Sequence, residues 1–229
     1  FIYFLLQNIV EAGFENVIMV VGKDFDDFKK QLDNLNFNNK LKIDYAIQKI
    51  PKDRVKPFGT ADAVFQTMDQ IEILKNSSFC VCNSDNLYST NSLKTIRENA
   101  YENAVLAYDR DSLNFPKERV SSFSILMTDD NFNLLNFIEK PTQEQVDQNL
   151  DSNGKIRVSM NIFKFNGLQA FDFIKNCPIN PIRNEKELPS AIVNMINEND
   201  LYMKGIPIAE HVPDLTSKAD INIIQKLIE

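Results

Sequence analysis

Four short segments of the chain place polar or charged side chains directly after predicted strands. They are residues 48–60, 83–89, 139–141 and 211–216. Open α/β sheets bind their ligands beyond the carboxyl ends of their strands, so we expect a functional site to be assembled from these segments. The chemistry available there is that of carboxylates, amides, hydroxyls and a few cations.

The first segment is a basic loop that enters a predicted helix at Thr60. Its cations surround one acid, Asp53, in an otherwise acidic protein; they are Lys49, Lys52, Arg54 and Lys56. Free backbone N–H groups and the helix dipole at such an entry attract anions. The pattern therefore indicates an anion or nucleotide site, with a solvated basic loop and an ordinary threonine cap as the alternative.

The second segment contains Asp85, just past the predicted strand 79–82. A carboxylate in this place can hold Mg²⁺ against a phosphate group. The alternative is a turn-forming aspartate. Cys80 and Cys82, on one face of that strand, are expected to be plain core residues.

Composition sets the class of protein and the class of ligand. The 229 residues are 43% hydrophobic and 25% charged, which is ordinary for a soluble globular chain. The net charge of −7 argues against a nucleic-acid partner, which would need clustered cations. The longest apolar runs fall far short of the about 20 residues that span a bilayer, so we expect no membrane partner. An anionic ligand must then be held by a metal or by a few placed cations.

The three cysteines form neither a disulfide framework nor a CxxC pair, and His211 is the single histidine. The chain therefore lacks the ligands for a zinc site, and we expect it to reside in a reducing, cytoplasmic compartment. A homo-oligomer is compatible with the sequence.

The order of predicted elements specifies an α/β fold. Helices and strands alternate through the first half, which predicts a Rossmann-like, mostly parallel (mixed) sheet flanked by helices. In the second half, the pattern predicts a hairpin formed by residues 120–128 and 134–138. It predicts further strands at residues 158–165 and 201–206. A terminal helix is expected after Ser217. We expect a single domain, residues 1–229.

Six segments in chain order carry a likeness to a known family. They are Tyr3 to Gly22, Gln48 with Lys56-Pro57-Phe58-Gly59-Thr60-Ala61-Asp62-Ala63-Val64, Ser84-Asp85-Asn86-Leu87-Tyr88, Glu139-Lys140-Pro141, residues 159–165 and residues 214–221. Together they resemble the sugar-1-phosphate nucleotidyltransferases, along almost the whole chain. The resemblance implies a GT-A-like nucleotidyltransferase fold.

The resemblance also implies roles for individual residues. Nucleotide-binding residues would be Gln48 and Gly59 at the base, with Pro57, Thr60, Ala61 and Asn86 in the same segments. Asp85 and Asp214 would bind Mg²⁺, the implied cofactor, and Lys140 and Asp85 would be catalytic. The sugar phosphate would contact Glu139, Lys140, Asn161 and Arg183, the last through a weak match.

The sequence departs from the family pattern in three places. Ser84 replaces the glycine before the metal aspartate, and Val212-Pro213 replaces an aromatic residue. The family's glycine-rich loop, which cradles the triphosphate, would precede Phe1. We therefore expect the chain as given to lack its first strand and that loop, and by itself to be inactive.

The implied activity is transfer of a nucleoside monophosphate from a nucleoside triphosphate to a sugar 1-phosphate, with release of pyrophosphate. Gln48 favours UTP or dTTP, because an amide can pair with their imide edge, although it can flip to suit other bases. The alternatives are a cytidylyltransferase acting on an alcohol phosphate such as phosphocholine, a GT-A glycosyltransferase, and a non-catalytic homologue that senses sugar nucleotides. A glycosyltransferase normally presents two acids as D-x-D, whereas Asn83-Ser84-Asp85 offers only the second.

Overall fold

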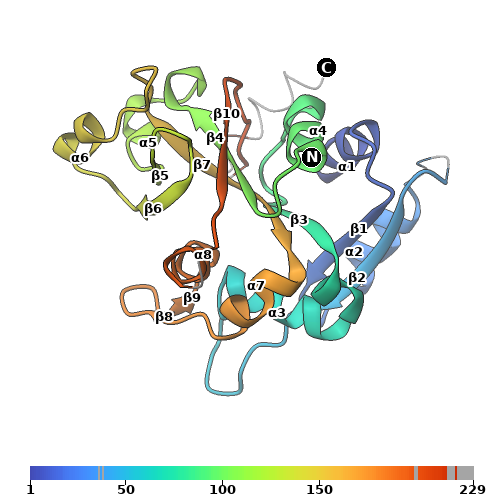
Figure 1. Ribbon diagram of the computed structural model, residues 1–229. Helices are drawn as coiled ribbons and strands as arrows, with labels where there is room; N and C mark the ends of the chain where they lie inside the picture. Colours follow the sequence, from blue (N-terminus) through green and yellow to red (C-terminus); the bar gives the residue numbers. More distant parts are fainter. Residues whose placement is uncertain (36, 38, 199–200, 216–219, 221–229) are drawn as a thin grey trace. The chain divides into compact units, whose positions relative to one another are not determined.

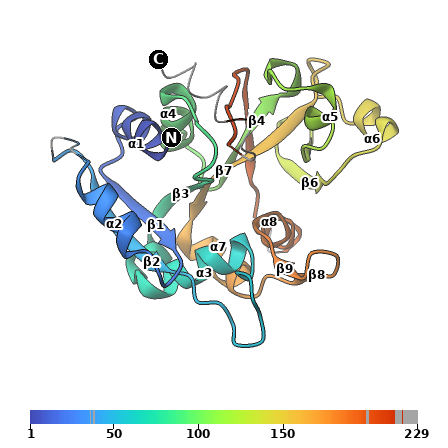
Figure 2. The same cartoon turned by 180° about the vertical axis from the view of Figure 1, so that it is seen from behind.

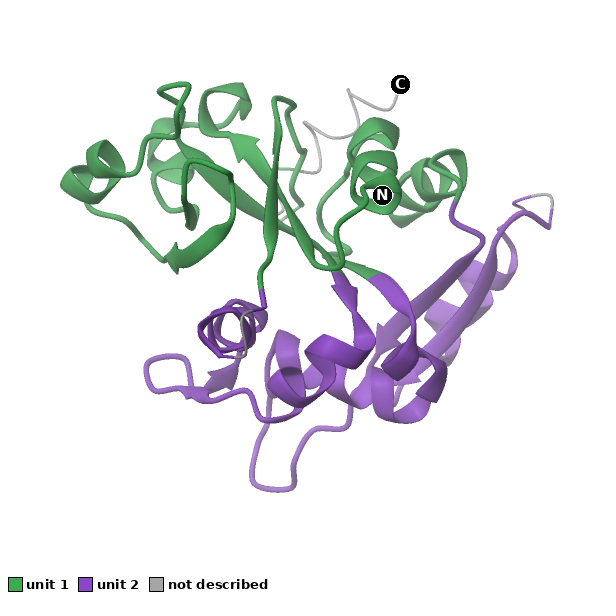
Figure 3. Ribbon diagram, viewed as in Figure 1, with its two compact units in different colours: residues 1–13, 80–164, 202–229 green, residues 14–79, 165–201 purple. Residues whose placement is uncertain are grey.

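The computed structural model describes residues 1–35, 37, 39–198, 201–215 and 220. The chain forms two compact units (Figure 3). Unit 1 comprises residues 1–13, 80–164 and 202–229, and unit 2 comprises residues 14–79 and 165–201. The expectation of a single domain stays a prediction.

The mixed sheet centred in unit 1 has the strand order β10-β4-β7-β5-β6, with β3 also paired to β7 (Figure 1). The strands are β3 (Ser78–Cys82), β4 (Ala104–Asp109), β5 (Ile125–Thr128), β6 (Leu134–Ile138), β7 (Arg157–Asn166) and β10 (Lys204–Ile208). Strand β4 runs parallel to β10 and antiparallel to β7, and all of its six residues are buried. The predicted mixed α/β sheet is thereby confirmed.

Helices complete unit 1. They are α1 (Ile2–Glu11), α4 (Thr90–Glu98), η2 (Arg110–Ser112), α5 (Lys117–Val120) and α6 (Gln143–Gln148). Helices α1 and α4 pack side by side, as both ribbon views show (Figures 1 and 2). Helix α1 stops before Gly13, whose positive φ of 85° favours glycine. The Ser89 hydroxyl caps α4 by accepting a hydrogen bond from the N–H of Ser92.

Unit 2 contains two small sheets and several helices. Its elements are β1 (Asn16–Val21), α2 (Asp26–Asp33), β2 (Lys42–Ile47), α3 (Thr60–Gln70), η1 (Glu72–Asn76), α7 (Gly167–Lys175), β8 (Ile179–Asn180), β9 (Glu185–Lys186) and α8 (Leu188–Asn197). Strands β1 and β2 pair in parallel along their whole length. Helix α3 packs against α7, α8 and β9, so the loop that enters α3 is held on a helical layer.

Some details differ from expectation. None of the residues of strand β1 is fully buried, and Val20 is 42% exposed; within the described residues β1 pairs only with β2. The hairpin strand β5 begins at Ile125, later than predicted, because Lys117–Val120 form helix α5. Strand β10 begins at Lys204 rather than at Leu201.

The expected terminal helix after Ser217 lies outside the described residues. No helix in the described part of the chain combines the length and the hydropathy required to cross a bilayer.

Candidate functional site

The two carboxylates expected to hold a metal come from neighbouring segments of unit 1. Asn86 and Asp214 form an isolated antiparallel bridge. On either side of it, the N–H of Leu87 donates to the carbonyl of Pro213 and the N–H of Leu215 donates to the carbonyl of Asp85, both at 2.8 Å. The turn after β3 and the loop after β10 are therefore joined by backbone hydrogen bonds, and Asp85 and Asp214 are brought into the same region.

The environment of Asp85 disfavours its charge. Burial raises the pKa of this carboxyl group, and the nearby charge of Asp214 raises it further, against lowering by hydrogen bonds from its own backbone and from Asn83. A cation beside the two carboxylates would relieve both unfavourable effects. Mg²⁺ is bound in proteins by one or two carboxylates together with substrate phosphates and water, so this oxygen donor set fits that ion. No cluster of three or more acidic, histidine or cysteine ligands exists among the described residues.

Arg119, which the sequence analysis did not single out, already holds Asp214. Its Nη2 lies 2.8 Å from Oδ2 of Asp214, and its Nη1 lies 2.9 Å from Oδ1 of Asp220. The guanidinium group also stacks over the ring of Phe115, 4.6 Å from its centroid. The sequence carries no signal for this contact because the acids follow Arg119 by 95 and 101 residues.

Glu210 anchors the loop that carries Asp214. Its carboxylate accepts hydrogen bonds from the first turn of α4, donated by Ser89, Asn91 and Ser92. These bonds lower the pKa of Glu210 against the opposing effect of burial. The end of β10 is thereby tied to a helix terminus four residues before Asp214.

Asn161 sits at a break in the register between β4 and β7. One residue of β4, Leu106, faces the stretch of β7 between Ser159 and Phe163, and Asn161 has a positive φ of 55°. Bulges of this kind redirect a side chain out of the regular alternation of a strand. Asn161 is consequently exposed, whereas Met160 and Ile162 on either side of it are buried.

Tyr88 connects this bulge to the Asp85 turn. Its ring is fully buried, and its hydroxyl donates to the carbonyl of Met160 at 2.6 Å while accepting from the N–H of Asn83 at 3.3 Å. The sequence placed Tyr88 in a motif without giving it a role. The structure gives it the role of a tether between two predicted site segments.

Glu139 and Lys140 follow β6 directly and are exposed. Lys140 has a positive φ of 46°, an uncommon conformation for a residue other than glycine, asparagine or aspartate. The sharp turn ends the strand and leaves the ammonium group on the surface of unit 1.

In unit 2, Gln48 is fixed by the residues that enter helix α3. Its Nε2 donates to the carbonyl of Gly59 at 3.1 Å and to Oδ2 of Asp62 at 2.9 Å. Oδ2 of Asp62 also accepts from Nε2 of Gln66, at 2.8 Å. Predicted base-binding residues from two segments are thus brought together, and Asp62 is an unforeseen member of the group.

The loop before α3 is anchored tightly. Gly59 has φ of 103°, and a Cβ there would lie 2.3 Å from the carbonyl oxygen of Lys186, so only glycine fits. Thr60 was expected to cap the helix, but Gly59 occupies the cap position and the Thr60 hydroxyl accepts from the N–H of Leu188 at 3.0 Å. Ala61 is fully buried and Pro57 is exposed.

Arg183, expected to contact phosphate, lies on the β8–β9 turn and pairs with Glu187 at 2.7 Å.

The predicted site residues fall into two groups, one in each unit. Unit 1 carries Asp85, Asn86, Glu139, Lys140, Asn161 and Asp214, and unit 2 carries Gln48, Pro57, Gly59, Thr60, Ala61 and Arg183. A common site for the two groups stays a prediction.

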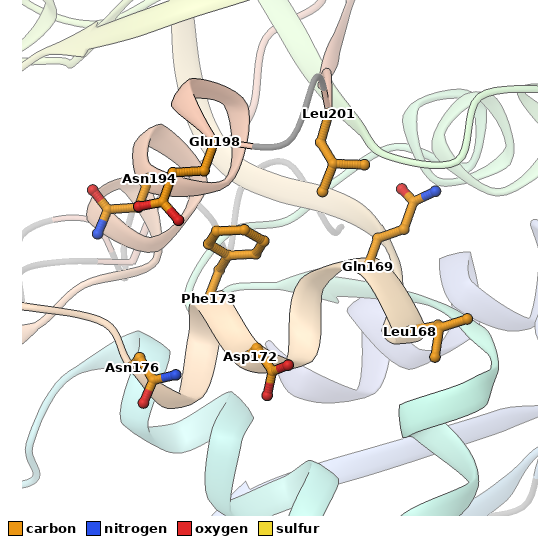
Figure 4. A pocket seen from close by; sticks show the side chains of 8 residues that line it. All are labelled: Leu168, Gln169, Asp172, Phe173, Asn176, Asn194, Glu198 and Leu201. Atoms are coloured by element: carbon orange, nitrogen blue, oxygen red, sulfur yellow. The ribbon is translucent and has the colours of Figure 1, made fainter.

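A cavity of about 500 Å³ lies between α7 and α8 within unit 2 (Figure 4). The lining side chains are Leu168, Gln169, Asp172, Phe173, Asn176, Asn194, Glu198 and Leu201. None of them belongs to the predicted site.

The two cysteines of β3 are not candidates for nucleophiles or metal ligands. Burial raises the pKa of Cys80 and of Cys82 to about 12 and keeps both thiols protonated.

Comparison with known proteins reveals relatives. The family profile described as nucleotidyl transferase matches residues 1–207. Glucose-1-phosphate adenylyltransferase of Photobacterium profundum is 30% identical over 84 residues, which cover 37% of this chain and 20% of the relative. The protein of the same name from Paramagnetospirillum magneticum is 29% identical over 128 residues, covering 54% of this chain and 28% of the relative. The matched region is therefore less than a third of the length of these relatives.

Proposed function

Because the chain belongs to the nucleotidyl transferase family, we propose that it transfers a nucleoside monophosphate from a nucleoside triphosphate to a sugar 1-phosphate. The observation that supports this most directly is the joining of the Asp85 and Asp214 segments by backbone hydrogen bonds in unit 1. The net charge of −7 makes such a carboxylate pair, with a metal, a suitable holder of phosphates.

The proposed reaction is a direct displacement. A phosphate oxygen of the sugar 1-phosphate attacks the α-phosphorus of the triphosphate, a new P–O bond forms, and the bond to the β-phosphate breaks as pyrophosphate leaves. The protein's part is to align two anionic substrates and to compensate their charge. Lys140, exposed on a sharp turn, is proposed to contact the sugar phosphate, with Glu139 and Asn161 at the sugar.

Asp85 and Asp214 are proposed to hold Mg²⁺. The ion would supply charge neutralisation at the phosphates of the bound nucleotide. Asp85 would gain from its binding because burial disfavours the unneutralised carboxylate. The cytoplasm, as the reducing compartment that suits three free cysteines, is part of the proposal.

The identity of the base is the finer part of the proposal. Gln48 taken by itself favours UTP or dTTP. The names of the relatives favour ATP and glucose 1-phosphate as the first substrates to test. ATP is our choice, because Asp62 holds the amide nitrogen of Gln48 and leaves its oxygen for the base.

The test is pyrophosphate release by the protein expressed from its whole reading frame, with each of ATP, CTP, UTP and dTTP and with glucose 1-phosphate. Asp85→Asn should lower turnover by about two orders of magnitude or more, because the metal loses a charged ligand. Lys140→Ala should also lower it. Matched controls are Asp130→Asn and Lys94→Ala, both exposed residues outside the proposed site. Unchanged turnover in Asp85→Asn would reject the metal role.

A further inference from the structure

We propose that Asp62 fixes the side-chain amide of Gln48 so that the base site offers a hydrogen-bond acceptor alone, and thereby selects adenine or cytosine, which carry an amino group where uracil and thymine carry a carbonyl. The inference rests on the proposed function, in which Gln48 meets the base. It adds a residue that sets specificity and a chemical class for the nucleotide.

The orientation of the Gln48 amide follows from its two partners. The carbonyl of Gly59 and the carboxylate of Asp62 can only accept hydrogen bonds, and they lie 3.1 and 2.9 Å from Nε2. Both hydrogens of the amide nitrogen are therefore engaged. A flipped amide would set its oxygen against two acceptor oxygens and lose both bonds.

Asp62 is itself held in place. Asp62 is only 9% exposed, and its Oδ2 accepts a hydrogen bond from Nε2 of Gln66 at 2.8 Å. Gln66 is in turn bound by the backbone of Lys49, accepting from the N–H at 2.8 Å and donating to the carbonyl at 3.0 Å. The chain of bonds runs from the backbone after β2 through helix α3 and back to Gln48, so the amide is fixed before any ligand arrives.

One atom of Gln48 is left for a ligand. Within the described part of the chain, no residue donates to its Oε1, which can accept a hydrogen bond. The group on the base that meets it must be a donor.

The common bases differ in how they present a donor. Adenine and cytosine carry an amino group that projects from the ring edge, whereas the donor of uracil and thymine is the ring N–H between two carbonyl oxygens. Those carbonyls require donors that Gln48 no longer has. They would also face the oxygen of Gln48. Guanine carries a carbonyl where adenine has its amino group, and its own amino group lies on the other side of the ring N–H.

The test measures binding separately from chemistry. A fluorescent ATP analogue is displaced from the protein by ATP, CTP, UTP or dTTP in the presence of Mg²⁺. We expect ATP and CTP to bind about tenfold more tightly than UTP and dTTP, the size of one good hydrogen bond. In Asp62→Asn, the new amide can donate to a flipped Gln48, so UTP should gain and the ratio should fall to about threefold or less. Asp69→Asn, on the exposed side of the same helix, is the matched control and should keep the wild-type ratio.

A second variant covers the case in which Asp62→Asn fails to fold. Gln48→Met keeps the side-chain length but removes the acceptor, so ATP should lose its advantage while UTP binding changes little. The inference is overturned if UTP binds as tightly as ATP to the wild type, if the ratio survives in both variants, or if no nucleotide displaces the probe.

Pyrophosphate release, measured on the same samples, distinguishes this inference from the proposed function. Selective binding of ATP and CTP without pyrophosphate release would refute the proposed transfer and leave the selection rule standing. Turnover without a base preference would refute the selection rule and leave the proposed transfer standing.

Discussion

The guanidinium group of Arg119 donates to the carboxylate of Asp214 at 2.8 Å, although Asp214 is one of the two residues proposed to hold a metal. The same guanidinium binds Asp220, and all three side chains are largely withdrawn from water. One cation therefore compensates two acids at this place. A metal that binds Asp214 must share it with Arg119.

Removal of Arg119 should destabilise unit 1. In Arg119→Ala, two poorly exposed carboxylates lose a charged partner, which should lower the free energy of unfolding by about 1.5–3 kcal/mol. Arg119→Lys should recover only part of the loss. The ammonium group keeps the positive charge but cannot form both directed bonds of the guanidinium. Urea denaturation provides the measurement, with the exposed neighbour Lys117→Ala as the control. Equal stability of Arg119→Ala and Lys117→Ala would contradict the structural role.

Asp85→Asn should separate stability from activity. Burial and the charge of Asp214 raise the pKa of Asp85, so the ionised carboxylate is less favourable in the folded protein than in the unfolded chain. Replacing it by a neutral amide of the same shape should raise the midpoint of thermal unfolding while turnover falls. A lower melting temperature than that of the wild type would show that the charge of Asp85 supports the fold.

Stability should depend on the single histidine. Burial lowers the pKa of His211, the positive charge of Arg119 adds to this, and Nδ1 accepts from the N–H of Asn114 at 3.2 Å. The unfolded chain therefore binds a proton more readily than the folded protein does. The contribution of His211 to stability should be complete above about pH 6.5 and should decrease as the pH falls below that value.

Two measurements check this titration. The imidazole resonance of His211, the one such signal in the chain, should titrate with a midpoint below about 6.5. Between about pH 7.5 and 5.5, on either side of the ordinary histidine pKa, His211→Gln should lose less unfolding free energy than the wild type. A midpoint above that ordinary value would refute the assignment of a buried, neutral ring.

Tyr88→Phe should loosen the proposed site. The change removes the hydroxyl that joins Asn83 to the carbonyl of Met160 and leaves buried polar groups without that partner, at a cost of about 1–3 kcal/mol. Tyr45→Phe is the matched control, because the buried Tyr45 hydroxyl has no partner among the described residues. Turnover should fall in Tyr88→Phe alone, and a loss of equal size in both variants would argue against a tether.

The sequence predicted those features that depend on neighbouring residues. The mixed order of helices and strands follows from local patterns, and the structure confirms it. The roles of Asp62, Arg119 and Glu210 depend on which distant side chains meet, and periodicity contains no such information. Thr60 shows the same limit, because its hydroxyl serves Leu188 instead of the nearby helix terminus.

The three hydrogen bonds of Glu210 to the first turn of α4 also have an evolutionary consequence. They couple the loop of Asp214 to a helix pair, α1 and α4, that contains none of the proposed site residues. Substitutions in that pair that shift α4 would alter the proposed metal site without changing a proposed ligand. The helix pair would thereby give selection a means to tune the proposed dependence on Mg²⁺ concentration while the residues proposed to contact substrate stay unchanged.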